Sequence, residues 1–147
     1  MPHSHARASA DMLHLADISL YVIHLSIIVY SLIGWAWRRG RRAHLIFLGV
    51  IFACWFGIGL ALGYGIGYCP LTHWHWLVKI ELGASYGDLP VSFIKHVWDA
   101  ALPWSISAKA ADILTFAAFF TSVAITVYVN FIKRPPPAEP AEANIRS

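Results

Sequence analysis

The sequence predicts an all-α membrane protein with three transmembrane helices and two short interfacial helices in an external loop. Hydrophobic residues make up 58% of the 147-residue chain and charged residues only 13%, a balance far from that of soluble proteins. Segments 18–37, 45–66 and 113–132 contain no Asp, Glu, Lys or Arg. About 20 such residues are enough to cross a bilayer core as a helix, in which the backbone groups are hydrogen-bonded internally.

The ends of the chain differ in composition from the apolar segments. Residues 1–12 are mostly polar, and we expect them to be flexible ahead of a membrane domain that covers residues 13–133. The apolar run at 18–37 is too long for a secretory signal, and arginines follow it, so we expect it to remain in the mature protein. Residues 134–147 form a Pro-rich tail that we expect to be disordered, because it has almost nothing to bury.

The basic residues predict the orientation. The formal net charge is +3 at pH 7, and the basic residues gather after the first and third apolar segments, at Arg38, Arg39, Arg41, Arg42, Lys133 and Arg134. Positively charged loops stay on the cytoplasmic side. We therefore expect the N-terminus outside and the C-terminus in the cytoplasm of a bacterial inner membrane. The excess of basic over acidic residues is then explained by topology and by attraction to lipid headgroups, and it indicates no nucleic-acid partner.

The external loop, residues 67–107, divides into two helical patterns. Thr72 is suited to cap a helix over His73–Leu82, and Pro90 is suited to the first turn of a second helix that reaches Ala101. Each pattern has one apolar face. We therefore expect both helices to lie in the outer interface, with the tryptophans of the loop at the level of the headgroups.

Three glycines at the end of the second segment form a GxxxGxxxG row, at Gly59, Gly63 and Gly67. On a helix, such a row leaves a flat strip where another helix can approach closely. We expect these residues to pack against small residues of the third segment. A helix of another chain is the alternative.

Polar residues follow one face of the first segment. His14, Asp17, Tyr21 and His24 recur at spacings of three and four residues, which places them on one side of a helix. His24 lies about 9 Å inside the membrane, where an ionisable side chain is either functional or hydrogen-bonded to a neighbouring helix. Asp112 precedes the third segment at the same leaflet. We expect a polar cluster of these residues near the outer surface.

The stretch GYCPLTHWHW adds residues that can bind metals. Cys69, His73 and His75 are candidate metal ligands, because thiolate and imidazole ligate transition metals, although the two histidines share a face only in a strand. Haem would need His24 with His96 or another loop histidine as ligands. A thiol enzyme built on Cys69 with a loop histidine as base is a further alternative. The sequence contains no GxSxG, no phosphate-binding glycine loop and no HExxH.

Three short motifs resemble a known family. The CPLT at Cys69–Thr72, the Phe-Ile-x-His at 93–96 and the early His-Leu pair at 24–25 resemble domain of unknown function 2784, a family of small bacterial membrane proteins. The resemblance covers residues 13–131, and it implies the fold and the membrane location without an activity. Many relatives have an acidic residue in the second helix, where this chain has none.

The sequence therefore favours a non-enzymatic membrane component. Such a protein would lie in the lipid bilayer as an accessory, assembly or structural subunit. It would dock on other membrane proteins or on another copy of itself. The alternative is a redox or metal protein with haem or a transition metal near the outer leaflet, held by His24, Cys69 and His96. No cofactor is favoured by the pattern alone.

Overall fold

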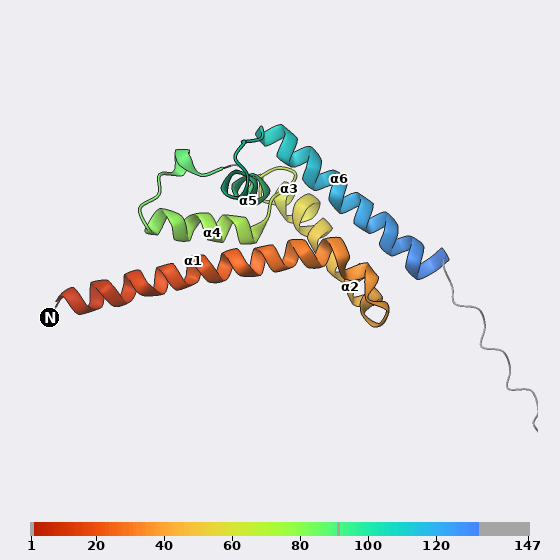
Figure 1. Ribbon diagram of the computed structural model, residues 1–147, viewed down its shortest axis with the longest axis horizontal. Coiled ribbons are helices and arrows are strands. Elements are labelled where there is room, and N and C mark those ends of the chain that lie inside the picture. Colours follow the sequence, from red (N-terminus) through yellow and green to blue (C-terminus); the bar gives the residue numbers. More distant parts are fainter. Residues whose placement is uncertain (1, 91, 133–147) are drawn as a thin grey trace, which may run out of the picture.

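The structure of the protein is a computed structural model, which describes residues 2–90 and 92–132. These residues form helices and connecting loops without any strand (Figure 1). Three helical stretches within them are long and apolar enough to cross a membrane: Ser9–Ala36, Arg38–Ala61 and Ala108–Ile132. The predicted all-α membrane fold with three spans is therefore confirmed. The predicted Pro-rich tail at 134–147 lies outside the described residues.

Helix α1 (Pro2–Ile33) is longer than the first predicted span. It has 32 residues, which corresponds to a length of about 48 Å. Its first turns occupy residues 2–12, which we expected to carry little structure. The physical reason is that no glycine or proline follows Pro2 before the apolar run, and proline is itself suited to the first turn of a helix. After Ile33 the chain passes through a short 3-10 turn, η1 (Gly34–Ala36).

The second span is built from several helical pieces. A 3-10 turn, η2 (Arg38–Gly40), leads into α2 (Arg41–Phe52), which continues through the π-helical segment η3 (Ala53–Ile58) into the short α3 (Gly59–Ala61). The helix thus ends at Ala61, five residues before the predicted end of this span at residue 66.

The glycine row corrects our prediction of helix packing. Only Gly59 lies in the helix, whereas Gly63 and Gly67 follow it with φ angles of +76° and +89°, a left-handed backbone that favours glycine. The loop after the helix turns back, since Tyr64 N and Gly65 N donate to the Gly59 carbonyl at 2.9 and 3.1 Å. A Cβ on Gly63 would meet nothing within 4 Å. These glycines therefore serve the helix exit, and they do not form a strip for another helix.

The two helices expected in the external loop are present, with different starts. Helix α4 (Pro70–Glu81) begins at Pro70, so Cys69 occupies the N-cap position that we expected for Thr72. After the turn η4 (Tyr86–Asp88), helix α5 (Phe93–Ala101) is capped by the Ser92 side chain, which accepts a hydrogen bond from Lys95 N at 3.3 Å. That both helices lie in the membrane interface stays a prediction.

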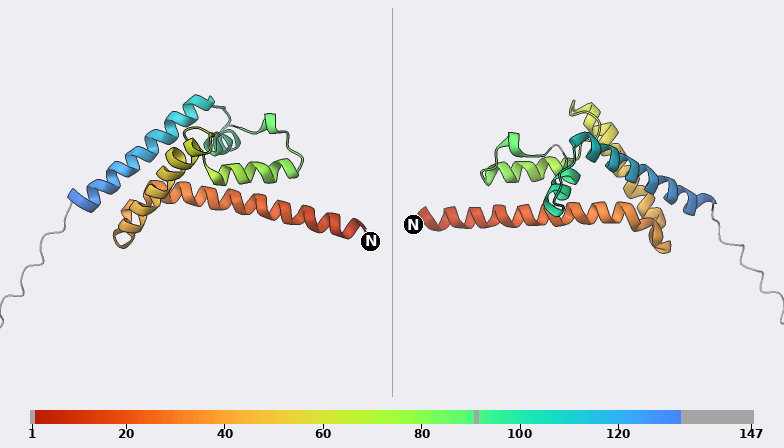
Figure 2. Two further views of the ribbon diagram at one scale, coloured as in Figure 1. Left: turned by 180° about the vertical axis from the view of Figure 1, so that it is seen from behind. Right: turned by 45° about the horizontal axis from the view of Figure 1, so that its top comes forward.

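The long helices are spread apart, and α1 meets the other two spans only near its C-terminal end (Figures 1 and 2). The third span consists of α6 (Ala108–Val127) and the π-helical turn η5 (Tyr128–Ile132). The N-terminal half of α1 leads away from α2 and α6. Helix α4 runs beside the middle of α1, and α5 lies between α4 and α6 (Figure 1). The chain therefore forms an open framework with small clusters of buried residues.

One buried cluster joins the three spans, and we call it the three-span junction: Ser31, His44, Ser122 and Thr126. The Ser31 carbonyl, in the last turn of α1, accepts hydrogen bonds from the Ser122 hydroxyl on α6 and from His44 Nε2 on α2, the latter at 3.2 Å. The other ring nitrogen of His44 lies 3.1 Å from Thr126 Oγ1. His44 and Thr126 are fully buried. Polar groups thus hold the spans together where lipid supplies no hydrophobic driving force.

Candidate functional site

Ionisable and aromatic side chains gather where α1 passes α4 and α5. We call this group the histidine cluster, and its members are Asp17, Tyr21, His24, Cys69, His75, Lys79, Phe93 and His96. The face of α1 predicted from the sequence supplies the first three, and α5 supplies the last two. The other three are Cys69, at the N-cap of α4, and His75 and Lys79 within α4. The cluster therefore depends on the contact between the first span and the loop at residues 67–107.

Asp17 joins α1 to α4. His75 Nε2 lies 2.7 Å from Asp17 Oδ1, and Lys79 Nζ lies 3.0 and 3.3 Å from the two carboxylate oxygens. His75 and Lys79 are four residues apart, so they stand on the same side of α4. Because an ionised carboxylate only accepts hydrogen bonds, the Nε2–H of His75 is the donor. The His75 ring is fully buried, and its Nδ1 atom has no hydrogen-bond partner among the described residues.

His24 occupies the inner part of the cluster. Its ring stacks on Phe93 with a centroid distance of 3.9 Å and an interplanar angle of 15°. Its Nε2 atom lies 3.8 Å from Cys69 Sγ, a weak sulfur contact that links α1 to the N-cap of α4. Only 6% of His24 is exposed, and its Nδ1 atom also has no hydrogen-bond partner in the described part of the chain.

His96 and Tyr21 complete the cluster through ring contacts. The Tyr21 ring lies 5.3 Å from Phe93 and 6.2 Å from His96. The rings of His75 and His96 are 6.4 Å apart and perpendicular, and Trp76 packs edge-on against His96 at 5.3 Å. Edge-to-face contacts of this kind hold aromatic rings in fixed positions. The cluster is therefore a packed group of rings with one ion-paired side.

Burial sets the charge of the two loop histidines. Burial lowers the pKa of His75 below its usual value, and the hydrogen bond and charge of Asp17 oppose this only in part. Burial also lowers the pKa of His96, and the positive charge of Lys79, joined by that of His75 when this ring is protonated, acts in the same direction, while Asp17 and Asp99 oppose it. Both rings are therefore neutral at pH 7. A neutral His75 that donates through Nε2–H keeps Nδ1 as a lone-pair acceptor.

Several predicted site residues lie elsewhere. His73 is two residues from His75 and therefore faces away from the cluster, packing against the rings of Tyr64 and Tyr68 at 5.6 and 5.8 Å. Cys69 and His75 consequently share no site with His73. No three His, Cys, Asp or Glu residues are placed to hold a metal ion within residues 2–90 and 92–132.

The predicted polar cluster is likewise only partly assembled. The structure brings Asp17 and Tyr21 together with the histidines of the loop. His14 and Asp112 are exposed, and no contact joins either of them to the cluster in the described part of the chain. The spacing of the polar residues identified this face of α1. Which residues of the loop contact it depends on how α4 lies along α1.

Sequence reasoning missed three residues of this framework. His44 was left outside the second span because it precedes the apolar run at 45–66, although the helix begins at Arg41. Its position between the arginine-rich turn at 38–42 and the apolar run that starts at residue 45 was the available signal. Lys79 could have been found from its place one helical turn after His75. Phe93 was noted only as the first residue of the Phe-Ile-x-His motif, and this motif did not indicate that His24 would stack on its ring.

Comparison with known proteins gives a family without an activity. No curated protein and no solved structure matches the chain. The family model described as protein of unknown function DUF2784 matches residues 14–131. This range contains all three spans of the membrane domain except the first residues of α1 and the last of η5, together with every member of the histidine cluster. The chain therefore belongs to the DUF2784 family of proteins of unknown function.

Proposed function

We propose that this protein is a non-enzymatic accessory or structural component of a bacterial inner membrane that docks on other membrane proteins. One observation carries the proposal. In the most apolar 18 residues of the three spans, only 11%, 17% and 22% of the residues are buried inside the chain. Most of the span surface is therefore left for contacts outside the chain, as expected of a subunit that completes its packing in a larger assembly.

The external elements support the same proposal. The bonds from Asp17 to His75 and Lys79 fix α4 on α1. The Lys95 ammonium pairs with Asp99 of the same helix and ties α5 to the following loop through the Ser105 hydroxyl and the Ile106 carbonyl. Large aromatic side chains remain on the outside of these fixed elements. They are Trp74, Tyr86 and Trp104, with 58%, 79% and 58% of their surface exposed. Tryptophan and tyrosine in such positions suit a protein interface or the headgroup region.

Purification of the full chain from its own membranes in mild detergent tests this proposal. We expect a specific membrane protein to copurify in fixed stoichiometry. Trp74→Ala is expected to weaken the association by about 2 kcal/mol or more if Trp74 lies in the interface. Leu62→Ala, which changes another exposed apolar residue on a different element, serves as the control. Recovery of the chain with lipid alone, under conditions that keep it folded, would contradict the proposal.

A second candidate function is the binding of haem or a transition metal at the histidine cluster. The observation that favours it is the pair of buried Nδ1 atoms on His24 and His75 without hydrogen-bond partners. Leaving a buried polar atom unpaired costs about 1–3 kcal/mol, which a bound ligand would recover. In addition, a carboxylate that accepts from the far nitrogen of a histidine is the usual support of a metal-bound imidazole, and Asp17 provides it for His75.

Metal analysis and absorbance of the purified protein distinguish the two candidates. If the cluster binds a cofactor, stoichiometric metal or a Soret band should persist after dialysis against a chelator. His75→Gln should then remove it, whereas His73→Gln should not, because His73 lies on the same helix outside the cluster. Metal-free, colourless protein that nevertheless holds its partner would exclude the second candidate.

A further inference from the structure

Arginine side chains without partners stand between the first two spans. We call residues 37–42 the arginine turn. Arg38, Arg39 and Arg42 are exposed, and no hydrogen bond or ion pair in the described part of the chain involves any of them. Because the turn joins two stretches that are long and apolar enough to cross a membrane, it belongs at the level of the lipid headgroups.

The fourth arginine of the turn holds it in place. Arg41 Nε donates to the Trp35 carbonyl at 3.0 Å, and Arg41 Nη1 donates to the Val129 carbonyl at 3.5 Å. Val129 belongs to η5, so the arginine turn is attached to the end of the third span. The other three guanidinium groups are therefore presented from a fixed backbone.

The charges of these three arginines are not balanced by acidic side chains. Asp17 lies about 24 Å before the end of α1. The other acidic residues of the described chain belong to the opposite ends of the spans or to the loop between the second and third, at Asp11, Glu81, Asp88, Asp99 and Asp112. Arg42 follows Arg38 and Arg39 by four and three residues in one continuous helical stretch, so the like charges are neighbours and repel each other. An anion between them relieves this repulsion.

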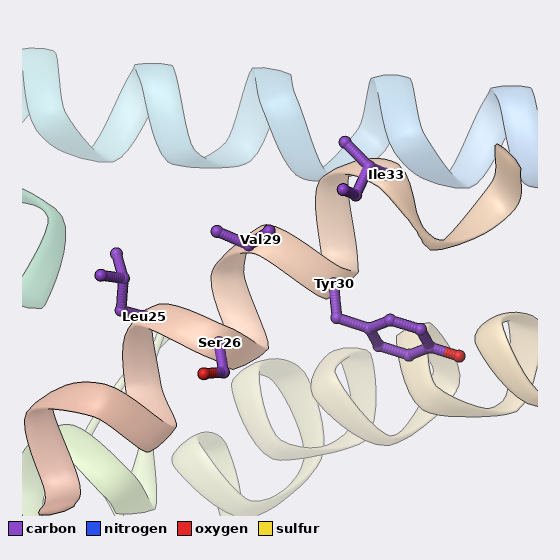
Figure 3. A pocket seen from close by; sticks show the side chains of 5 residues that line it. All are labelled: Leu25, Ser26, Val29, Tyr30 and Ile33. Carbon is purple, nitrogen blue, oxygen red and sulfur yellow. The ribbon is translucent and has the colours of Figure 1, made fainter. Parts of the chain in front are cut away.

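An apolar groove on α1 leads toward the arginine turn. It has a volume of about 380 Å³ and is lined by Leu25, Ser26, Val29, Tyr30 and Ile33, all of them on α1 (Figure 3). Ile33 is the last residue of α1, and only η1 separates it from the arginine turn. The groove therefore extends along the helix from the hydrocarbon region toward the headgroups.

The groove has a fixed wall and an apolar lining. The Tyr30 ring is held by edge-to-face contacts with His44 and Phe47 of α2, at centroid distances of 5.2 and 4.9 Å. The Ser26 hydroxyl donates to the Val22 carbonyl at 2.8 Å, so its hydrogen is already used within α1. An occupant of the groove therefore meets mainly hydrocarbon surface, which suits an acyl chain.

We propose that this site binds one molecule of an anionic phospholipid, with its phosphate at the arginine turn and one acyl chain in the α1 groove. Guanidinium groups bind phosphate through paired, charge-assisted hydrogen bonds. Trp37, in the same turn, is 65% exposed, and an indole ring suits the level of the headgroups. The inference goes beyond the accessory role and does not depend on it.

The groove beside the charges favours a phospholipid over a free anion. A free phosphate would meet exposed guanidinium groups whose attraction is screened by salt. A phospholipid is held at this depth by its acyl chains, so its phosphate stands beside the arginine turn at a high effective concentration. The negative charge also distinguishes the bound molecule from the surrounding zwitterionic lipid, which fills the groove equally well but does not relieve the repulsion.

Native mass spectrometry of the full chain in neutral detergent tests the site. Delipidated protein is titrated with phosphatidylglycerol and, separately, with phosphatidylcholine that has the same acyl chains. We expect one phosphatidylglycerol per chain to bind about tenfold or more tightly than phosphatidylcholine. Equal affinity for the two lipids would overturn the proposal. Displacement of phosphatidylglycerol by an equal concentration of inorganic phosphate would overturn the assignment to a lipid.

A charge variant tests the arginine turn. Arg38→Gln combined with Arg42→Gln should weaken phosphatidylglycerol binding by about tenfold or more, because each basic residue adds to the attraction. Arg7→Gln combined with Lys109→Gln is the matched control, since it removes the same charge from exposed positions far from the turn in sequence. Equal weakening by the two pairs would show a general effect of net charge and would contradict a site at the turn.

A second variant tests the groove by filling it. Ser26→Phe should weaken phosphatidylglycerol binding by about fivefold or more, because the ring occupies the space of the acyl chain. Ser19→Phe makes the same change at an exposed position of α1 outside the groove and should leave binding unchanged. Circular dichroism checks that both variants keep their helices. Binding that is insensitive to Ser26→Phe in folded protein would refute the acyl-chain contact.

Discussion

Asp17 joins two helices through one carboxylate. Its partners, His75 and Lys79, lie on α4 and are separated from it by about sixty residues of sequence, at distances of 2.7 and 3.0 Å. Losing this carboxylate would leave the buried Nε2–H of His75 without an acceptor and Lys79 without a counterion. The attachment of α4 to α1 therefore depends on this residue more than on any single apolar contact between the two helices.

Asp17→Ala should destabilise the docked α4 by about 1–3 kcal/mol, because a buried donor loses its partner. Hydrogen–deuterium exchange over residues 70–81 measures the effect as faster exchange of the α4 amides. Asp11→Ala, at an exposed position of the same helix, is the matched control and should change little. Equal exchange in the two variants would show that the carboxylate does not hold α4.

Gly34 is needed where α1 meets α2. A Cβ at this position would collide with the His44 ring and come within 2.9 Å of the Tyr30 ring. His44 has no room to move aside, because it is fully buried and bonded on both nitrogens. The three-span junction therefore requires glycine here for close approach.

Gly34→Ala should lower the free energy of unfolding by about 1–3 kcal/mol through overpacking. Gly49→Ala is the matched control, since a Cβ at Gly49 meets nothing within 4 Å and alanine favours a helix by about 1 kcal/mol. Thermal unfolding in detergent micelles compares the two variants. The account of the junction fails if Gly34→Ala is as stable as Gly49→Ala.

At the scale of elements, α4 and α5 are packed around neutral histidines. The folded protein lowers the pKa of His75 and His96, chiefly by burial, so folding favours their neutral forms. The groups that face them are Asp17, Lys79 and Asp99, and the rings of Tyr21 and Trp76. The contribution of these histidines to the stability of the folded protein is fully present above their ordinary pKa of about 6.5. This stability is lost as the pH falls below that value.

Acidification from pH 7.5 to 5.5 should therefore loosen the docking of both loop helices. The measurement is hydrogen–deuterium exchange of residues 70–81 and 93–101, corrected for the intrinsic effect of pH on exchange. His96→Gln should reduce the acid effect, because it removes one titrating ring, while His73→Gln should not. Protection that stays constant or increases at pH 5.5 would contradict the sign of these shifts.

The sequence predicts the existence of these elements better than their ends. Three apolar runs without charge identify the spans, because length and hydropathy are sufficient in lipid. The end of the second span depends on whether Gly63 and Gly67 are helical. A GxxxG spacing is compatible with a helix, so it did not predict the positive φ angles that these two residues adopt. The start of α1 was missed because the helix extends toward the N-terminus beyond the apolar run at 18–37, into residues of low hydropathy.

The candidate site could be predicted only on the side of α1. The spacing of Asp17, Tyr21 and His24 identifies one helical face, and the structure uses that face. Which loop histidine meets it depends on the rotation of α4 about its axis, and this in turn depends on contacts between residues far apart in the sequence. The rotation selects His75 and leaves His73 on the other side.

At the scale of the whole molecule, the basic residues predict one orientation for all three spans. A phosphatase reporter fused after Arg42 should be inactive, because a turn rich in arginine is expected to stay in the cytoplasm. The same reporter inserted at Gly87, in the loop between α4 and α5, should be active. Activity in the reverse pattern would place the histidine cluster at the inner leaflet and the three-span junction at the outer one.

The open arrangement of the spans gives the molecule its main functional implication. Three helices that bury so little of one another expose long apolar faces. The exposed faces of α2 and α6 and the aromatic side chains of the external loop remain for other partners.

Native mass spectrometry of the full chain, extracted from its own membranes with surrounding lipid, tests the accessory role most directly. The account predicts the chain together with a different membrane protein in a fixed ratio. The chain recovered with lipid alone, while its helices and the α4 contact remain intact, would contradict the account.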